Sequence, residues 1–384
     1  MPFDFVTFID RHQYPTQKWQ RYEDDVLPLW VADMDFVSPP AIVEALQARV
    51  DHGVFGYGRT PDSLLQTLCQ WSQQHYDWEI MPEWQLWLPG VVPALHLASL
   101  ALTEPGEGVL TVTPIYPPFL KVAEHTGRLA QTAELTEPSA LGEGWRLDRE
   151  ALEAAITPQT KLLLWCHPHN PTGRVWQHEE LAVIAELAER HDLLVVSDEL
   201  HCDLILEDES HRPLAALFPE LADRIITIWA PSKTFNVAGL SCACAVISNA
   251  ILRQRFEQAM SGLMPGVNVL GLLAAEVAYA EGETWRQELL DVLRANRERI
   301  GEYVERWPGV SWQVPESTYL AWLDLRQAGL GDSPQRVLLE QARVALSDGV
   351  DFGWPGFVRL NFGTPTALLE QGLQRLDEVL RACP

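Results

Sequence analysis

A lysine that follows an apolar run has the clearest chemical potential in this sequence. Lys233 lies in Ala230-Pro231-Ser232-Lys233-Thr234-Phe235-Asn236, directly after Ile225 to Trp229. Such a run predicts a strand, and α/β sheets bind ligands at the carboxyl ends of their strands. An average loop lysine is solvated, but this chain has few others, namely Lys18, Lys121 and Lys161. Schiff-base chemistry requires a buried amine with a lowered pKa, so we predict that Lys233 is a nucleophile.

An acidic residue ends a second predicted strand. Asp198 follows Leu194-Val195-Val196-Ser197, and taken alone it could equally cap the next helix. The presence of Lys233 allows a second interpretation of Asp198, as a residue that binds a cofactor. An aldehyde cofactor with a pyridine ring needs an amine for its carbonyl and a carboxylate that keeps its ring nitrogen protonated. One strand end would supply each group.

A turn rich in Pro and Gly follows the predicted strand 161–166. In His167-Pro168-His169-Asn170-Pro171-Thr172-Gly173, the amide of Asn170 could donate a hydrogen bond at the same sheet edge. His167 and His169 could in principle ligate a metal. No further cluster of Cys, His or Asp supports such a site, so we expect no metal.

A possible phosphate site lies in Pro89-Gly90-Val91-Val92-Pro93, which joins a predicted strand to a helix. The first amide N–H groups of a helix have no partner within it and lie at the positive end of its dipole. A glycine at such a turn is, by itself, weak evidence for a phosphate site. The sequence has no G-x-x-x-x-G-K-[ST], G-x-G-x-x-G, H-E-x-x-H or G-x-S-x-G pattern, so nucleotide-binding, zincin and serine-hydrolase interpretations lack their markers.

Two tyrosines lie in predicted loops. Tyr116, in Pro114-Ile115-Tyr116-Pro117-Pro118-Phe119, follows the predicted strand 108–112 and could stack on a flat ring. Tyr57, in Gly56-Tyr57-Gly58-Arg59, precedes the predicted sheet. Each alone is equally compatible with an ordinary half-exposed tyrosine.

These residues need a sheet that brings several strand ends to one edge. Between about residues 84 and 250, short apolar runs alternate with longer amphipathic ones, which is typical of β-α-β units in a mainly parallel sheet covered on both faces. The predicted strands are Gln85–Leu88, Gly108–Val112, Lys161–Cys166, Leu193–Ser197, Ile225–Trp229 and Ser241–Ile247, and the predicted helices include Pro93–Leu102 and His178–His191.

The 384 residues are enough for roughly two or three domains. We predict a large domain over residues 46–280 and a small domain built from both ends of the chain, 1–45 and 281–384. A helix is expected to begin at Pro39-Pro40, and a long helical stretch to run from about 268 to 306. No linker rich in Gly, Ser or Pro marks the boundary, so this division rests on the pattern alone.

The composition excludes several classes of protein. A net charge of −25 repels phosphate backbones and anionic lipid surfaces, so we expect neither nucleic acid nor membrane as a partner. The six cysteines contain no C-x-x-C pair, which favours a reducing cytoplasm over a disulfide framework or a zinc site. The first residues show no basic and apolar leader pattern, and the most apolar stretch, Val267 to Ala280, is short and carries Glu276.

Taken together and in this order, these residues resemble the fold-type I pyridoxal 5′-phosphate (PLP) enzymes of the aminotransferase class I/II superfamily, and more closely the MalY/PatB family of cystathionine β-lyases. The resemblance covers residues 29 to 362. It rests on Leu29-Trp30-Val31-Ala32-Asp33-Met34-Asp35-Phe36, Pro89-Gly90-Val91-Val92-Pro93-Ala94-Leu95, Asn170-Pro171-Thr172-Gly173-Arg174-Val175-Trp176, Ser197-Asp198-Glu199-Leu200-His201, Ser232-Lys233-Thr234-Phe235-Asn236 and Phe357-Val358-Arg359-Leu360-Asn361-Phe362. It implies the PLP-dependent transferase fold of type I, with a mainly parallel seven-stranded sheet and a smaller α/β domain.

The resemblance also assigns residues around the cofactor ring. It implies that Lys233 bonds to the cofactor aldehyde, that Asp198 pairs with the pyridine nitrogen, and that Asn170 donates to the phenolic oxygen. Tyr116 would stack on the ring. His201 stands three residues after the aspartate, where typical aminotransferases carry tyrosine, and it is counted among the cofactor-binding residues.

A second group is assigned to the phosphate and the substrate. The resemblance implies that Ser232 and the amides of Val91 and Val92 hold the phosphate. Tyr57 would reach across from the second subunit of a homodimer. Arg359 would bind the substrate α-carboxylate with its guanidinium fork.

The activity implied is α,β-elimination, which cleaves cystathionine or another cysteine thioether to a thiol, pyruvate and ammonia. An aminotransferase of class I/II is the first alternative, since it shares every step up to the carbanion. Aminotransferases usually carry an arginine some eight residues beyond the lysine, whereas this sequence has Gly239-Leu240-Ser241-Cys242 there. This difference, together with His201, favours the lyase. A PLP-binding regulatory or interaction protein is the second alternative.

Overall fold

A computed structural model describes residues 3–139 and 143–382 of the chain. Its largest element is a seven-stranded sheet with the strand order β2-β8-β7-β6-β5-β3-β4. The strands are β2 (Gln85–Leu88), β3 (Gly108–Thr113), β4 (Leu129–Glu134), β5 (Thr160–Cys166), β6 (Leu194–Asp198), β7 (Ile225–Trp229) and β8 (Ala243–Val246). All neighbouring strands are parallel except β8, which runs antiparallel to both β2 and β7. The expected mainly parallel sheet is confirmed.

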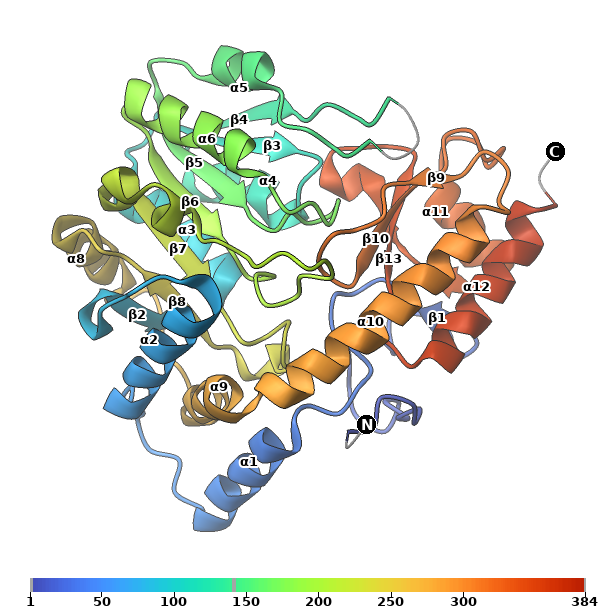
Figure 1. Cartoon of the computed structure of the whole chain (residues 1–384), viewed down its shortest axis with the longest axis horizontal. Coiled ribbons are helices and arrows are strands. Elements are labelled where there is room, and N and C mark those ends of the chain that lie inside the picture. Colours follow the sequence, from blue (N-terminus) through green and yellow to red (C-terminus); the bar gives the residue numbers. More distant parts are fainter. Residues whose placement is uncertain (1–2, 140–142, 383–384) are drawn as a thin grey trace.

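Helices cover both faces of this sheet (Figure 1). On one face, α3 (Val91–Leu102), α4 (Pro117–Thr126) and α8 (Ala250–Met260) pack on strand residues such as Leu164 and Val196. On the other face, α5 (Arg149–Ala155), α6 (His178–Arg190) and α7 (Leu214–Leu217) pack on alternate residues, including Leu163 and Val195. Because both faces are buried, the central strands consist almost entirely of apolar residues.

The predicted strands and helices match the observed ones within two residues at each end, but β4 was not predicted. Its sequence, Leu129 to Glu134, is an edge strand with mostly exposed side chains, so it lacks the apolar run that marks the central strands. The predicted helical stretch 268–306 is two helices, α9 (Val269–Glu281) and α10 (Glu283–Val304). They meet at Gly282, where a Cβ atom would lie 2.3 Å from the carbonyl oxygen of Ala278 and 2.4 Å from the ring of Phe235.

Smaller sheets join the two ends of the chain. A four-stranded antiparallel sheet has the order β12-β13-β10-β9, and β1 pairs in parallel with β11. The strands are β1 (Leu27–Pro28), β9 (Ser311–Trp312), β10 (Leu320–Asp324), β11 (Val344–Ala345), β12 (Ser347–Asp348) and β13 (Phe357–Asn361). The N-terminal β1 therefore lies beside the C-terminal elements, near α10 and α12 (Thr366–Leu380) (Figure 1).

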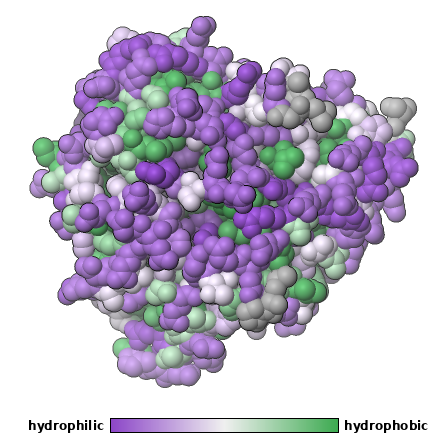
Figure 2. Space-filling view, in the orientation of Figure 1, coloured by the Kyte–Doolittle hydropathy of each residue, from purple (hydrophilic) through white to green (hydrophobic). Residues whose placement is uncertain are grey.

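The remaining helices are α1 (Pro40–His52), α2 (Asp62–Tyr76) and α11 (Pro334–Val337), with short turns at Pro82–Trp84, Pro219–Arg224, Ala238–Leu240, Leu338–Ala342 and Gly349–Phe352. The start of α1 at Pro40 confirms the predicted helix start. Hydrophilic residues dominate the face seen in Figure 2, and hydrophobic ones are scattered among them. Within the described ranges, no helix combines the length and apolar character needed to span a bilayer. The same ranges contain no cluster of three or more His, Cys, Asp and Glu side chains suited to a metal.

Candidate active site

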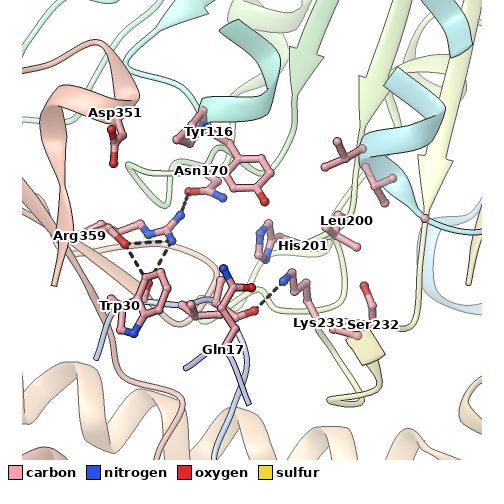
Figure 3. Close-up of a pocket in the computed structure, with 18 of the residues that line it drawn as sticks. Gln17, Trp30, Tyr116, Asn170, Leu200, His201, Ser232, Lys233, Asp351 and Arg359 are labelled. Atoms are coloured by element: carbon pink, nitrogen blue, oxygen red, sulfur yellow. Dashed lines mark hydrogen bonds between the residues drawn. The ribbon is translucent and has the colours of Figure 1, made fainter. Parts of the chain in front are cut away.

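A cavity of about 660 Å³ lies at the carboxyl ends of the parallel strands. Its walls come from both parts of the chain: the loops after β5, β6 and β7, the first turns of α3 and α4, and segments beside β1 and β13 (Figure 3). The structure brings together nine of the predicted site residues in this cavity: Val91, Val92, Tyr116, Asn170, Asp198, His201, Ser232, Lys233 and Arg359. Strand ends that are far apart in the sequence thus meet at one edge of the sheet, as expected.

Lys233 follows β7 and extends its amine into the cavity (Figure 3). Its Nζ donates a 2.6 Å hydrogen bond to the carbonyl oxygen of Ala32. Burial lowers the pKa of Lys233 to about 8, although Asp33 and Asp198 favour the charged form and Arg359 opposes it. About one tenth of this amine is therefore neutral and nucleophilic at pH 7, compared with less than about one thousandth for an exposed lysine with its usual pKa near 10.4.

Asp198 is the last residue of β6, and only 5% of it is exposed. Its Oδ1 accepts a 3.1 Å hydrogen bond from the backbone N–H of Leu200. Burial raises the pKa of Asp198 to about 7, Glu199 raises it further, and the hydrogen bond and Lys233 lower it. A cation within hydrogen-bond reach would hold this carboxyl in its charged form, as a protonated ring nitrogen would.

Arg359 lies in β13 and is buried. One Nη atom donates to Oδ1 of Asn170 at 2.9 Å, and the other donates to the carbonyl oxygen of Trp30 at 3.2 Å. Its Nε has no hydrogen-bond partner, and burial lowers its pKa to about 10. Within residues 3–139 and 143–382, Arg359 forms no salt bridge, so this buried guanidinium lacks a counter-ion. A ligand carboxylate would supply one.

The contact with Arg359 also fixes the amide of Asn170. Because Oδ1 accepts from Arg359, Nδ2 is left to donate toward the cavity (Figure 3). The backbone N–H of Tyr116 donates to the carbonyl oxygen of Asn170 at 3.1 Å, which holds the start of α4 beside this loop. The Tyr116 ring then forms part of the cavity wall.

His201 is buried beside these groups, 3% exposed. Burial lowers its pKa to about 3, and the neighbouring Lys233 and Arg359 lower it as well. The imidazole is therefore neutral at physiological pH. Its Nδ1 has no hydrogen-bond partner among the described residues, so this nitrogen can form a hydrogen bond with a ligand.

The N-terminus of α3 forms the other end of the cavity. Gly90 precedes the helix with φ = +143°, a conformation that favours glycine, and no side chain caps the helix there. The first amides, those of Val91 and Val92, therefore remain open toward the cavity, and Ser232 lines the same region. Free helix amides beside a hydroxyl suit an anion such as phosphate.

Tyr57 is the predicted site residue that does not lie in this cavity. It is in the loop between α1 and α2, and its side chain is fully exposed. No other predicted site residue lies close to that loop in the sequence. Its assignment through a second subunit stays a prediction.

The sequence did not predict the contribution of residues 30–32 and Tyr319. Trp30, Val31 and Ala32 line the cavity, and the carbonyl groups of Trp30 and Ala32 accept hydrogen bonds from Arg359 and Lys233. Tyr319 donates to the same Ala32 carbonyl. The available signal is that Trp30 to Phe36 lies in one of the segments on which the family resemblance rests, although the resemblance assigns these residues no role.

The acidic residues of that segment, Asp33 and Asp35, form ion pairs with Arg11 and Lys18. Asp35 is buried and contacts Lys18 at 2.7 Å and Arg11 at 2.8 Å. Asp33 contacts Arg11 at 2.8 Å. Lys18 is 1% exposed. We infer that it serves this ion-pair cluster, which leaves Lys233 as the lysine available to a ligand in the cavity.

Comparison with known proteins places this geometry in a family. The family model for aminotransferase class I and II matches residues 24–376. The cystathionine β-lyase PatB of Bacillus subtilis is 39% identical over 363 residues, 93% of each chain. A crystal structure of OvoB is 43% identical with a TM-score of 0.95 and covers 99% of this chain and 100% of its own. The structure of cystalysin from Treponema denticola, which contains PLP, is 32% identical with a TM-score of 0.94 over 99% of both chains.

Proposed function

Because the chain belongs to the aminotransferase class I and II family, and within it to the MalY/PatB group, we propose that it is a PLP-dependent C–S β-lyase. It would release a thiol, pyruvate and ammonia from cystathionine or another cysteine thioether. The observation that carries the proposal is the cavity that joins a buried amine of low pKa, Lys233, to a buried arginine without a counter-ion, Arg359.

The residues of the cavity fit PLP. Lys233 would bond to its aldehyde, Asp198 would pair with its ring nitrogen, and the α3 amides with Ser232 would bind its phosphate. Nδ2 of Asn170 is oriented to donate to its phenolic oxygen. When bound, PLP supplies an electron sink for the charge that develops at the substrate Cα.

The chain's own groups bind the substrate and move its proton. Arg359 would hold the α-carboxylate with its guanidinium fork, which places the substrate Cα near Lys233. The neutral amine of Lys233 would then remove the Cα proton. With a thiolate on Cβ as leaving group, the Cβ–S bond breaks and the thiol departs. These residue roles are part of the proposal.

One feature of the cavity favours the lyase over an aminotransferase. Where aminotransferases typically carry an arginine beyond the lysine, Ser241 and Cys242 line this cavity instead. The pocket is therefore less cationic at that position, and His201 adds no charge because its pKa is lowered to about 3.

The deciding experiment is incubation of the PLP-loaded protein with cystathionine or an S-alkyl cysteine in the absence of any keto acid. A lyase releases pyruvate and thiol in equal amounts over many turnovers. An aminotransferase stops after one half-reaction and resumes only when a keto-acid acceptor is added. That second result would overturn the proposal.

A homodimer is also part of the proposal. Four side chains around the α1–α2 loop are more than half exposed although apolar or aromatic: Val50, Val54, Phe55 and Tyr57. Grouped apolar side chains of this kind typify protein interfaces. We propose that a second copy of the chain covers them and that Tyr57 then completes the partner's cavity.

Mixed dimers test this arrangement. Tyr57→Ala and Lys233→Ala are each expected to be weakly active or inactive alone. In a hybrid, the Tyr57→Ala subunit keeps its lysine and receives Tyr57 from its partner, so one site is intact. Unfolding and refolding an equimolar mixture should recover about a quarter of wild-type activity, since half of the dimers are hybrids with one working site. Recovery at the level of the separate variants would exclude a shared site.

We propose the domain division 46–280 against 1–45 with 281–384, of which residues 1–2, 140–142 and 383–384 lie outside the described ranges. We also propose a cytoplasmic location. Cys69, Cys166, Cys202, Cys242 and Cys244 are free thiols, which suits a reducing compartment, and Cys383 lies outside the described residues. The charge of −25 supports neither nucleic acid nor membrane as a partner.

A further inference from the structure

Two donors meet at the carbonyl oxygen of Ala32. Nζ of Lys233 lies 2.6 Å from it, and the hydroxyl of Tyr319 lies 3.0 Å from it. Tyr319 is fully buried and immediately precedes β10. A carbonyl oxygen has two lone pairs, so both donors can bind it at once.

This carbonyl belongs to a segment, residues 30–36, that forms no strand, yet side chains hold its backbone on both sides. Nδ2 of Asn361 donates to the carbonyl groups of Val31 and Asp33. Further along, Asn236 accepts from the N–H of Met34 and donates to the Met34 and Phe36 carbonyl groups. The Ala32 carbonyl is thus fixed independently of Lys233.

Asn236 also ties this segment to the loop of the lysine. It stands three residues after Lys233 and has φ = +54°, a left-handed conformation that is uncommon for residues other than glycine. Its three hydrogen bonds to residues 34 and 36 compensate for that strain. The segment 30–36 and the Lys233 loop therefore form one unit with a fixed spacing.

Three charged groups and one neutral imidazole surround the amine. Asp33 belongs to the segment itself, Asp198 ends β6, Arg359 lies in β13, and neutral His201 follows β6. Asp33 is paired with Arg11. None of the four donates or accepts a hydrogen bond with Nζ in the described part of the chain; the Ala32 carbonyl does.

We propose that the Ala32 carbonyl, held by Tyr319, is the docking point of the Lys233 amine once substrate has displaced it from the cofactor. The reaction concerned is that of the proposed function, on which this inference rests. A neutral amine that donates one N–H to Ala32 keeps its lone pair free for another direction. The docked amine therefore presents that lone pair to the cavity as a base.

The proton balance is simple. The Cα–H bond of the substrate breaks, its proton forms the third N–H bond of the amine, and the electron pair remains on the substrate. The ammonium keeps its hydrogen bond to Ala32 throughout, so the nitrogen need not move during the transfer. In this scheme Lys233 is a catalytic residue, and Tyr319 is a positioning residue that acts through Ala32.

Tyr319→Phe tests the proposal while preserving the packed ring. Without the hydroxyl, the Ala32 carbonyl accepts from the amine alone, so it binds an ammonium more strongly and is itself less fixed. Tyr303→Phe is the matched control, because that hydroxyl donates to Glu370 on the outer helices and lies outside the cavity.

The first measurement needs no turnover. The full chain, freed of cofactor, is labelled at several pH values with a trace of an amine-reactive reagent, and the labelled lysines are quantified by peptide mass spectrometry. Exposed Lys121 serves as the internal reference. In Tyr319→Phe, labelling of Lys233 relative to Lys121 should fall about threefold at pH 7, equivalent to a rise of about half a pKa unit. An unchanged ratio overturns the proposal.

The second measurement uses the holoenzyme. With Cα-deuterated substrate, Tyr319→Phe should show a larger isotope effect on kcat and a several-fold lower kcat with little change in KM, whereas Tyr303→Phe should match the wild type. Equal isotope effects in the two variants overturn the docking role. If wild-type enzyme releases no pyruvate, the proposed function fails instead, and the labelling ratio still decides whether the amine docks at Ala32.

Discussion

Lys233→Ala is expected to lower pyruvate release by at least about 10⁴-fold, because in the proposed reaction this lysine supplies both the covalent link to the cofactor and the general base. The variant should still bind PLP noncovalently, since the α3 amides, Ser232 and Asp198 remain. Borohydride treatment should then fix no pyridoxyl group on the peptide that contains residue 233, whereas the wild type is labelled there.

Because the chain has few lysines, borohydride labelling at residue 233 is easily distinguished from labelling elsewhere. Lys121 is exposed and pairs with Glu124, and Lys18 is buried in its ion-pair cluster with Asp35. Lys121→Ala is the matched control and should keep wild-type turnover and labelling at residue 233. Partial recovery of Lys233→Ala by a small added amine would support the role as base. Near-normal turnover of Lys233→Ala would refute the assignment and, with it, the proposed reaction.

The parts of the fold that sequence predicts well are those where burial is complete. β5, β6 and β7 consist mainly of apolar residues because helices cover both faces of the sheet. The ends of these strands locate Asn170, Asp198 and Lys233, because the carboxyl ends of parallel strands and the loops that follow them lie at one edge of the sheet. β4 escapes this reasoning, since an exposed edge strand needs no apolar run.

The remaining part of the site depends on packing between distant segments. Ala32 contributes a backbone carbonyl, which every residue type possesses, and Tyr319 reaches it across 287 positions of sequence. Nothing in either residue type signals that contact. Likewise, Gly282, where α9 ends and α10 follows, lies so close to Phe235 that a side chain there would clash, a contact that helical periodicity does not encode.

Asp198→Asn is expected to separate catalysis from folding. An amide cannot form an ion pair with a protonated pyridine nitrogen, so the electron sink weakens and turnover should fall by about 10³-fold. Asp332→Asn, a change of the same kind at an exposed position, should leave turnover unchanged. Pyruvate release under saturating substrate and cofactor is the measurement, and a loss smaller than tenfold would contradict the role of Asp198.

Although Asp198→Asn should lower turnover, it should raise the stability of the cofactor-free protein, and the size of this gain should depend on pH. Burial raises the pKa of Asp198 from 3.8 to about 7, so the native state holds its proton more tightly than the unfolded state does. Stability is therefore lost as pH rises from about 4 to about 7, by at most about 4 kcal/mol, and then levels off. Asparagine does not titrate, so cofactor-free Asp198→Asn should gain on the wild type across this window.

Thermal midpoints at pH 4.5 and pH 8, with and without PLP, test this linkage. Without PLP, the midpoint of Asp198→Asn relative to that of the wild type should be higher at pH 8 than at pH 4.5. Added PLP should reverse the order at pH 8, because a ligand that binds the native state stabilises it according to its affinity, and the wild-type carboxylate binds the ring nitrogen more tightly. A difference between the two proteins that is the same at both pH values, or an equal gain from PLP, would show that Asp198 neither carries the raised pKa nor contacts the ring. Because burial makes the Asp198 carboxyl costly to ionise and a bound cation would stabilise its charged form, we predict that this charge serves cofactor binding rather than folding.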